Sequence, residues 1–475
     1  MGWDGRSSSW KIVACSIDID RLAYEAEKAD GAVEDDPPIV DVEPGAGLKR
    51  SQWELEEEEG CPNLQATSSN SGIHAPQASD CAEQRGEGVA CTPVSVNHSN
   101  KRRAKKRKAE KEKNGQYPRS TVFERYVQGA AVISNTLDFS ALGATVGGYS
   151  GKRKPVSGVK TVYSKGDLLE KQGFKEVKWD GIVTQPLGRN PVLLSDVKGR
   201  IFCTLVGRPQ GTRYTEACKE VFEAMADEAS GTGLEAQTAA PHRRGRFPAI
   251  NVGVFHGQGT RHPIWLNNGK YTAMMKRLTS LPAVQQIASF ASASFAAFSL
   301  NVYGYYKKRL DHLFRKTPEL PRLFPASVSV YPSAGFNFGP DVWTYKHRDV
   351  LNCPFGWCAV QSLGRFDTTK GGHLVLWEAR LVIEFPSGSL ILLSSAAITH
   401  SNLPVGSGDV RASFTHYASG GIFRYIDYGL RTEKGLKEED YELWDEVRRE
   451  KEGKWKAGCN LMSTVEGLSS KKNVV

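Results

Sequence analysis

The sequence predicts an α+β fold in which helices precede a C-terminal region rich in short strands. Residues 270–315 have the pattern of two consecutive helices, and six or seven short apolar runs separated by Gly, Pro and Ser follow from residue 325. Strands recurring at such short intervals are typical of a barrel or sandwich. Residues 1–100 differ: acidic tracts and Ser-, Asn-, Gln- and Gly-rich runs predict a mostly disordered N-terminal region.

The elements of the predicted folded region, residues 117–435, follow from spacing. Ile201, Cys203 and Leu205 alternate as on a strand with one buried face, and residues 213–230 space their apolar side chains as a helix does. Residues 247–263 predict a strand that runs into a Gly-rich turn. The later strands are predicted at "FPASVSVYP" (324–332), "FGWCAVQSLG" (355–364), "GGHLVLWEA" (371–379), "LVIEF" (381–385), "GSLILLSS" (388–395), "RASFTHYAS" (411–419) and "GIFRYIDYG" (421–429). Residues 436–475 predict one charged helix, about 436–456, and a polar tail.

The charge of the chain is concentrated in one tract. The 475 residues carry a formal net charge of +9, which is compatible with a nucleic-acid partner. "KRRAKKRKAEKEK", residues 101–113, holds nine basic and two acidic residues. We predict a nuclear import signal with some affinity for phosphates, and hence a nuclear protein; a solvated tether is the alternative.

The cysteines and the apolar runs indicate in which cellular compartment the protein is expected. Nine cysteines without regular spacing argue against a secreted disulfide framework, and Cys353 and Cys358 are predicted to be buried free thiols and not zinc ligands. The most apolar run, residues 287–303, contains four serines and an asparagine, which favours a packed helix over a membrane span. A reducing intracellular compartment is therefore expected.

Three side chains suggest a metal site. In "WTYKHRDVLN", residues 343–352, His347 and Asp349 are two positions apart and would point the same way on a strand. A third ligand is available at His400, at the end of "PSGSLILLSSAAITHSN", residues 386–402. Two histidines and one carboxylate form the facial triad of non-haem Fe(II) oxygenases, which leaves positions open for cosubstrate and dioxygen. We predict His347, Asp349 and His400 as catalytic metal ligands.

A basic side chain follows at a suitable place for a cosubstrate. Arg411 lies on the next predicted strand, and alternation places Ser413 on the same face. A buried arginine grips a carboxylate through paired hydrogen bonds, with Ser413 as a further donor.

These segments resemble a known family. "HRDVLN", "PSGSLILLSSAAITH" and "RASFTHY" look like the TET/JBP branch of Fe(II)/2-oxoglutarate dioxygenases, in particular its compact fungal TET-like members. The resemblance spans about 320–430 and extends more weakly back to about 120. It implies a double-stranded β-helix (jelly-roll) core flanked by helices. It also implies Fe(II), 2-oxoglutarate and dioxygen as cofactors, and oxidation of 5-methylcytosine in DNA to its hydroxymethyl, formyl and carboxyl forms.

The resemblance also assigns roles to single residues. His347, Asp349 and His400 match the iron triad, and Arg411 and Ser413 match the 2-oxoglutarate clamp. His373 matches a further cosubstrate contact, Asn352 a contact to the target base, and Tyr417 an aromatic that stacks on the flipped base. Ser419 stands where animal enzymes carry a histidine. His416 is a candidate substitute for that histidine, although strand alternation points it away from the face that carries Tyr417. The cysteine-rich and zinc-finger regions of the animal enzymes are missing.

The partner predicted by this reading is double-stranded DNA with methylated bases, bound by a monomer that does not enter a membrane. Lys152–Lys154, Arg243–Arg246 and Lys307–Arg309 are candidate phosphate contacts, and Arg261 in the Gly-rich turn is a candidate DNA or cosubstrate contact. Three alternatives stay open: an N6-methyladenine DNA demethylase using the same site, a protein hydroxylase, and a non-catalytic DNA-binding protein of a mobile element.

Overall fold

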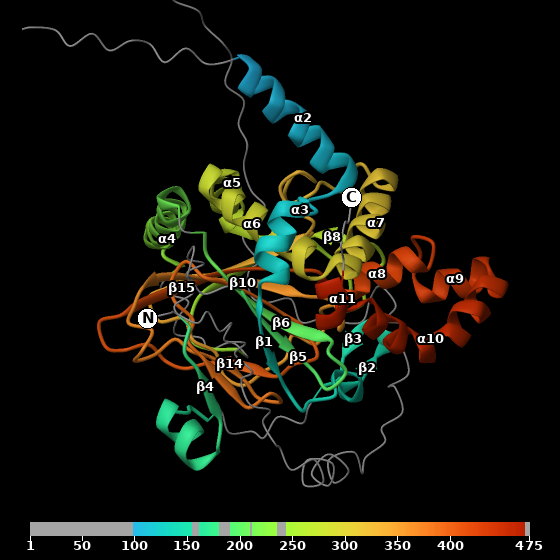
Figure 1. Ribbon diagram of the computed structural model, residues 1–475. Coiled ribbons are helices and arrows are strands. Elements are labelled where there is room, and N and C mark those ends of the chain that lie inside the picture. Colours follow the sequence, from blue (N-terminus) through green and yellow to red (C-terminus); the bar gives the residue numbers. More distant parts are fainter. Residues whose placement is uncertain (1–97, 154–160, 180–190, 210, 235–243, 471–475) are drawn as a thin grey trace, which may run out of the picture. The chain divides into compact units, whose positions relative to one another are not determined.

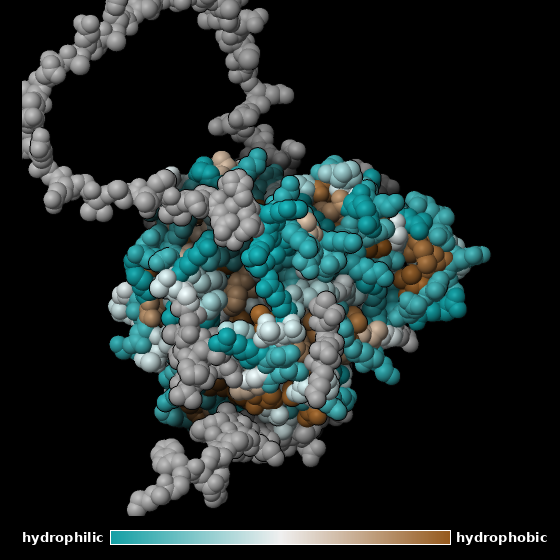
Figure 2. All heavy atoms as spheres, turned by 45° about the horizontal axis from the view of Figure 1, so that its top comes forward, coloured by the Kyte–Doolittle hydropathy of each residue, from teal (hydrophilic) through white to brown (hydrophobic). Residues whose placement is uncertain are grey.

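The computed structural model describes residues 98–153, 161–179, 191–209, 211–234 and 244–470 (Figure 1). The chain divides into two units, Ala32–Ala104 and the remainder, and the elements discussed here from Lys105 onward belong to the larger unit. The predicted disordered region 1–100 lies outside the described residues except for its last three positions. On the face seen in Figure 2, hydrophilic residues cover most of what is described.

Two sheets form the centre of the larger unit. The first has nine strands in the order β1 (Ala131–Ser134), β5 (Val192–Ser195), β6 (Ile201–Gly207), β13 (Leu390–Leu393), β10 (Cys358–Arg365), β15 (Val410–Tyr417), β9 (Ser333–Asn337), β7 (Ala249–Phe255) and β8 (Ile264–Trp265). The second has four, in the order β14 (His400–Asn402), β11 (Leu374–Leu376), β12 (Leu381–Ile383) and β4 (Lys175–Val177). β2 (Ala144–Thr145) and β3 (Ser150–Gly151) form a separate pair. Neighbours are antiparallel except β1 with β5 and β12 with β4.

The central strands of the nine-stranded sheet are buried on both faces, and β13 shows how the sequence achieves this. Ile391 and Leu393 share a core with apolar side chains of β11 and β12, whereas Leu390 and Leu392 join a cluster that includes residues of the helices. A strand covered on both faces is apolar at every position, as "LILL" is.

Four helices cover the second face of the nine-stranded sheet (Figure 1): α4 (Thr212–Gly231), α5 (Thr272–Ser280), α6 (Pro282–Phe298) and α7 (Leu300–Lys316). α4 confirms the helix predicted over 213–230. Residues 270–315, however, form three helices and not two. Pro282 follows the extended Leu281 and begins α6, because proline lacks an N–H and is tolerated only in the first helical turn.

Two predicted strands are wrong. In residues 324–332 the amides of Val328 and Ser329 both donate to the carbonyl of Pro325, so the segment is a turn, and β9 begins only at Ser333. Residues 421–429 fall largely in a helix, α8 (Gly420–Asp427), whose buried Ile422, Phe423 and Ile426 have helical spacing.

The C-terminal segment forms three helices and not one helix with a polar tail. They are α9 (Glu433–Glu439), α10 (Tyr441–Leu461) and α11 (Val465–Ser470). Leu436, Cys459 and Leu468 from these helices are buried in the same cores as the strands. The folded unit therefore continues past residue 435.

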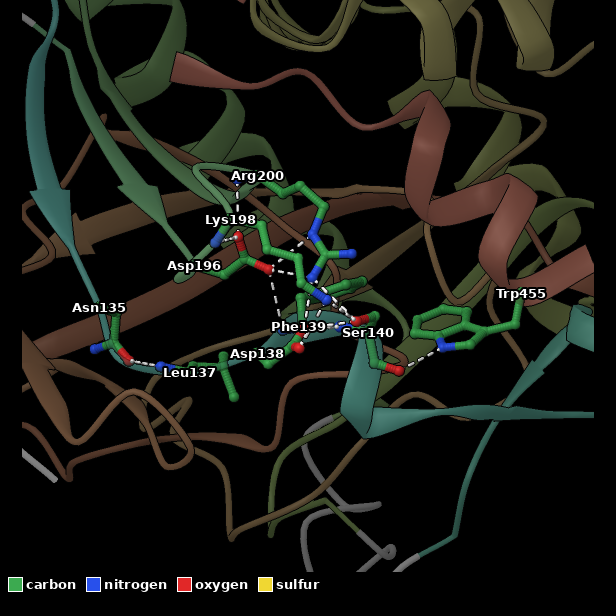
Figure 3. Close-up of polar contacts among 9 residues, drawn as sticks. All are labelled: Asn135, Leu137, Asp138, Phe139, Ser140, Asp196, Lys198, Arg200 and Trp455. Carbon is green, nitrogen blue, oxygen red and sulfur yellow. Dashed lines mark hydrogen bonds and ion pairs between the residues drawn. The ribbon is translucent and has the colours of Figure 1, made fainter. Parts of the chain in front are cut away.

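A buried ion pair lies in the turn between β5 and β6 and contacts the segment before β2 (Figure 3). Arg200 Nε donates to Asp196 Oδ2 at 2.8 Å, and Asp196 Oδ2 also accepts from the amide of Phe139 at 3.1 Å. The indole Nε1 of Trp455 in α10 donates to the carbonyl of Ser140 at 2.8 Å. The β5–β6 turn, the segment before β2 and a C-terminal helix are thus joined.

The remaining predictions concern surface and thiols. The basic tract 101–113 lies in α2 (His98–Asn114), and its side chains from Arg102 to Lys113 are exposed. Cys353 and Cys358 are buried free thiols, as predicted. Within the described ranges, no helix is both long and apolar enough to cross a membrane.

Candidate metal centre

His347, Asp349 and His400 converge, although the predicted strand at 343–352 does not form. Their ligand atoms all lie within 4.8 Å of one another. Instead of a strand, a single antiparallel bridge joins His347 to His400, with both N–H···O distances at 2.9 Å. His400 is the first residue of β14, which pairs with β11 in the smaller sheet. The 343–352 segment is therefore bridged to a strand of this sheet.

The two imidazoles are oriented by the backbone. His347 Nδ1 lies 2.7 Å from the carbonyl of Tyr345, and His400 Nδ1 lies 3.0 Å from the carbonyl of Ile398. A carbonyl only accepts, so each Nδ1 is the protonated nitrogen and each Nε2 keeps a free lone pair. His347 Nε2 is 3.9 Å from Asp349 Oδ1, and His400 Nε2 is 3.8 Å from Asp349 Oδ2.

The charges around the triad favour its metal-binding protonation states. Burial lowers the pKa of His347, so the imidazole is held neutral. Burial acts to raise the pKa of Asp349, but His347, His400 and Arg244 overcome it and the net shift is downward. A neutral imidazole at His347 and a carboxylate anion at Asp349 therefore face one another.

Arg244 is a neighbour of the triad that the sequence did not single out for this place. Its Nη1 lies 3.9 Å from Asp349 Oδ1, and its carbonyl accepts from the amide of Tyr345 at 2.8 Å. It was predicted only as one of a group of phosphate contacts, 243–246, whose first member lies outside the described residues. A cluster of arginines in a loop carries no signal of which one points inward.

Arg411 is positioned as a carboxylate-binding residue should be. It is 1% exposed on β15, its Nη1 donates to the carbonyl of Val342 at 2.6 Å, and its Nε has no hydrogen-bond partner among the described residues. Burial lowers the pKa of Arg411 to about 10, which leaves the guanidinium charged at neutral pH. A buried cation with an unused donor is costly unless an anion completes it.

Ser413 and Gly372 are neighbours of Arg411. Ser413 lies on the same face of β15 and accepts from Asn337 Nδ2 at 2.9 Å. Gly372 lies so close to Arg411 that a Cβ there would be 3.4 Å from Arg411 Cδ. The next residue, His373, is fully buried, and neither ring nitrogen has a hydrogen-bond partner in the part of the chain that the structure describes. Burial lowers the pKa of His373 to about 4.

One segment links Arg411 to the triad. The amide of Arg411 donates to the carbonyl of Pro340, and that of Val342 donates to the carbonyl of Arg411. Five residues on from Val342, His347 pairs with His400. The same short stretch therefore runs from the proposed carboxylate clamp to the metal ligands.

The predicted base contacts divide between the two faces of β15. Tyr417 lies on the same face of β15 as Arg411 and Ser413, and burial raises its pKa. His416 points the other way, into a cluster with the rings of Tyr331 and Phe414 at centroid distances of 5.6 and 4.4 Å. Because alternate residues face opposite sides, His416 is not brought to the site, and its assignment as a substrate contact is corrected.

Asn352 lies close to Asp349, whose carbonyl accepts from its amide at 2.9 Å, and Ser419 is the bridge partner of Asn352. Asn352 Nδ2 contacts Cys358 Sγ at 3.2 Å and Ser395 Oγ at 3.3 Å, and an isolated bridge pairs Asn352 with Ser419. Ser419 Oγ donates to the carbonyl of His256 at 3.2 Å, which brings the Gly-rich turn after β7 alongside. Arg261 in that turn is exposed, and the structure gives it no contact with the triad.

Two of the three predicted phosphate contacts at 307–309 are engaged within the protein, whereas Lys308 is exposed. Lys307 Nζ lies 2.5 Å from Asp311 Oδ2, and Arg309 Nε donates to Asp427 Oδ1 at 2.7 Å. Lys152 and Arg153 are exposed, while Lys154 is outside the described residues.

The side chains of the site fit an iron cofactor with its cosubstrate. Two imidazole nitrogens and one carboxylate oxygen are the ligand set that binds Fe(II) in non-haem oxygenases, where the open positions take 2-oxoglutarate and dioxygen. The unpaired Nε of Arg411 fits the distal carboxylate of 2-oxoglutarate.

Comparison with known proteins gives no family. No family model matches the chain, and no curated protein matches it. Among solved structures, NgTET1 in complex with 5mC DNA is similar at 15% identity and a TM-score of 0.34, over 52% of this chain and 83% of that one. A 2OG-Fe(II) oxygenase-family oxidoreductase from Burkholderia pseudomallei is similar at 19% identity and a TM-score of 0.23, over 40% and 78%. AviO1 from Streptomyces viridochromogenes is similar at 13% identity and a TM-score of 0.25, over 46% and 91%. At such low scores the functional assignment rests on the side chains of the site.

Proposed function

We propose that this chain is an Fe(II)- and 2-oxoglutarate-dependent dioxygenase of the TET/JBP type that oxidises the methyl group of 5-methylcytosine in DNA to hydroxymethyl-, formyl- and carboxylcytosine. The observation that carries the proposal is the convergence of His347, Asp349 and His400 within 4.8 Å. The buried cation of Arg411, tied to the same segment of chain, adds a place for the cosubstrate. A decayed site in a non-catalytic protein would have no reason to keep both.

Different residues of the site are proposed to bind the metal and the cosubstrate. His347 and His400 hold the metal through Nε2, and Asp349 holds it through its carboxylate. Arg411 and Ser413 bind the distal carboxylate of 2-oxoglutarate, with His373 beside them. When bound, iron with 2-oxoglutarate and dioxygen supplies the oxidation of a C–H bond, and 2-oxoglutarate leaves as succinate and carbon dioxide.

The target base must leave the duplex to reach this site. Extruding a base costs a few kcal/mol in lost pairing and stacking. Stacking on Tyr417 offsets roughly 1–3 kcal/mol of that cost. Asn352 and Ser419, which are bridge partners, are the proposed polar contacts to the base edge.

The wider assignment follows from the same reading. We propose that two groups of strands form a double-stranded β-helix. The first is β9-β15-β10-β13 of the larger sheet, and the second is β14-β11-β12 of the smaller sheet, to which the 343–352 segment is bridged. The exposed basic helix α2 is the proposed nuclear import signal, and the enzyme is proposed to act in the nucleus as a monomer.

The proposal is tested by product analysis on matched DNA duplexes. Purified protein is incubated with Fe(II), 2-oxoglutarate and duplexes carrying 5-methylcytosine, N6-methyladenine or no methyl group. We expect succinate and hydroxymethylcytosine from the first duplex, at a rate well above the unmethylated control. If only the N6-methyladenine duplex gives succinate and unmodified adenine, the substrate is N6-methyladenine and not 5-methylcytosine. If succinate forms equally without DNA, the substrate belongs to another class.

A further inference from the structure

An internal ion pair lies directly behind the metal ligands. Arg348 is the residue between His347 and Asp349, and it is 6% exposed. Its Nη2 donates to Glu378 Oε1 at 2.8 Å, and its Nε donates to Thr399 Oγ1 at 2.9 Å. Arg348 therefore points away from the metal site while its two chain neighbours point into it.

The carboxylate of Glu378 also holds the segment that carries the third ligand. Thr399 is the residue before His400. Its amide donates to Glu378 Oε2 at 2.7 Å, and its hydroxyl donates to Glu378 Oε1 at 2.6 Å. One carboxylate thus accepts hydrogen bonds from residues adjacent in sequence to all three ligands.

We infer that Arg348, Glu378 and Thr399 form a polar brace that sets the positions of His347, Asp349 and His400 before a metal binds. This inference rests on the proposed metal site. The brace acts through the ligands and touches neither metal nor substrate, so its members are positioning residues.

The local backbone explains why a brace is needed. The 343–352 segment has no regular strand pairing; β14 holds it through the bridge at His347 and through the amide of Asn402, which donates to the carbonyl of Thr344 at 3.1 Å. Ordering the residues of the segment costs conformational entropy, and without the brace this cost would fall on metal binding. Groups that hold ligands in place typically alter metal affinity by about 10–100-fold.

Stability alone is a poor explanation of the brace. A buried ion pair often contributes no more to folding than apolar residues of similar volume, because both charges are desolvated. The pair instead fixes one geometry, since Arg348 Nη2 and the Thr399 hydroxyl both donate to Oε1 of Glu378.

The brace is tested by metal affinity in the full chain, with Co(II) as the probe because its visible absorption reports binding. Thr399→Val removes the hydroxyl, keeps the β-branched shape and leaves the Arg348–Glu378 pair, whereas Thr399→Ser keeps the hydroxyl. Glu378→Gln removes the charge. We expect Co(II) affinity to fall about 10–100-fold in Thr399→Val and Glu378→Gln, and to stay close to wild type in Thr399→Ser.

A second buried carboxylate provides the matched control. Asp196, like Glu378, accepts from an arginine Nε or Nη and from a backbone amide, but its contacts are with the β5–β6 turn and the segment before β2 (Figure 3). Asp196→Asn should lower the melting temperature as much as Glu378→Gln does, yet leave Co(II) affinity unchanged.

The outcomes separate this inference from the proposed function. Wild-type affinity for Co(II) in Thr399→Val, or an equal loss in Asp196→Asn, would overturn the brace and leave the metal site in place. A wild-type chain that binds no Co(II) would overturn both.

Discussion

The backbones of His347 and His400 exchange two hydrogen bonds of 2.9 Å, so the two imidazoles stand side by side with ring centroids 4.3 Å apart. This pairing brings together residues more than fifty positions apart in the sequence. Asp349 faces both Nε2 atoms, so two imidazole nitrogens and one carboxylate are gathered in one place, as in the facial triad of non-haem Fe(II) oxygenases.

His400→Ala is expected to abolish turnover while leaving the fold intact. Removing a metal ligand should cost more than the roughly 100-fold upper limit seen for removing an outer-shell partner. Succinate formation from 2-oxoglutarate measures the loss. His262→Ala is the control, because His262 contacts Tyr425 and the structure gives it no contact with the triad. Equal activity in wild type and His400→Ala would remove His400 from the site.

Arg411→Lys is expected to raise the KM for 2-oxoglutarate by about 10–100-fold, since lysine keeps the charge but loses the paired donors, each charge-assisted hydrogen bond being worth about 1.5–3 kcal/mol. Steady-state kinetics at varied 2-oxoglutarate measures the change. Arg365→Lys, at an exposed position on the adjacent strand β10, should leave this KM as it is. An unchanged KM in Arg411→Lys would assign the cosubstrate to another residue.

Tyr417→Ala is expected to weaken binding of methylated DNA, and Tyr417→Phe is not, because stacking needs the ring and not the hydroxyl. Losing about 1–3 kcal/mol of stacking corresponds to roughly 5–150-fold in the KM for DNA, with the KM for 2-oxoglutarate unaffected. Tyr441→Ala, at a tyrosine that is 62% exposed on α10, is the control. A larger effect of Tyr417→Phe than of Tyr417→Ala would contradict stacking.

His416→Phe is expected to make stability less dependent on pH. Burial lowers the pKa of His416 to about 3, whereas an unfolded histidine titrates near 6.5. The unfolded chain therefore takes up a proton that the folded chain refuses, and the free energy of unfolding falls as the pH drops from about 6.5 towards 3. In the variant, the free energy of unfolding should change less with pH, by up to about 1.4 kcal/mol per pH unit. Urea unfolding at pH 7, 6 and 5 measures it, and an identical slope in both proteins would refute the account of His416.

Chemical identity and spacing were enough to select the metal ligands, but not the local structure that positions them. His347 and Asp349 were placed on a strand by alternation, whereas the structure has one bridge and an irregular segment. Arg348 could not be recognised as part of a brace, because its partners Glu378 and Thr399 come from other segments and a lone buried charge has no sequence signature. Arg244 was hidden among neighbouring arginines for the same reason.

The errors in the fold have a common cause. "GIFRYIDYG" and "FPASVSVYP" are short apolar runs, and runs of this length do not distinguish strand from helix or turn. Residues 436–475 are rich in charge and predict one charged helix with a polar tail, yet Cys459, Met462 and Leu468 pack into the cores. By contrast, "LILL" was recognised correctly as strand β13 because turn residues bound a run that is apolar at every position.

The most direct test is anaerobic titration of the apoprotein with Fe(II) in the presence of 2-oxoglutarate. The account predicts that the wild-type chain binds a single ferrous ion and that His347→Ala, Asp349→Ala and His400→Ala each lose it while remaining folded. A wild-type chain that takes up no iron, or three variants that bind it as tightly as wild type, would contradict the central claim.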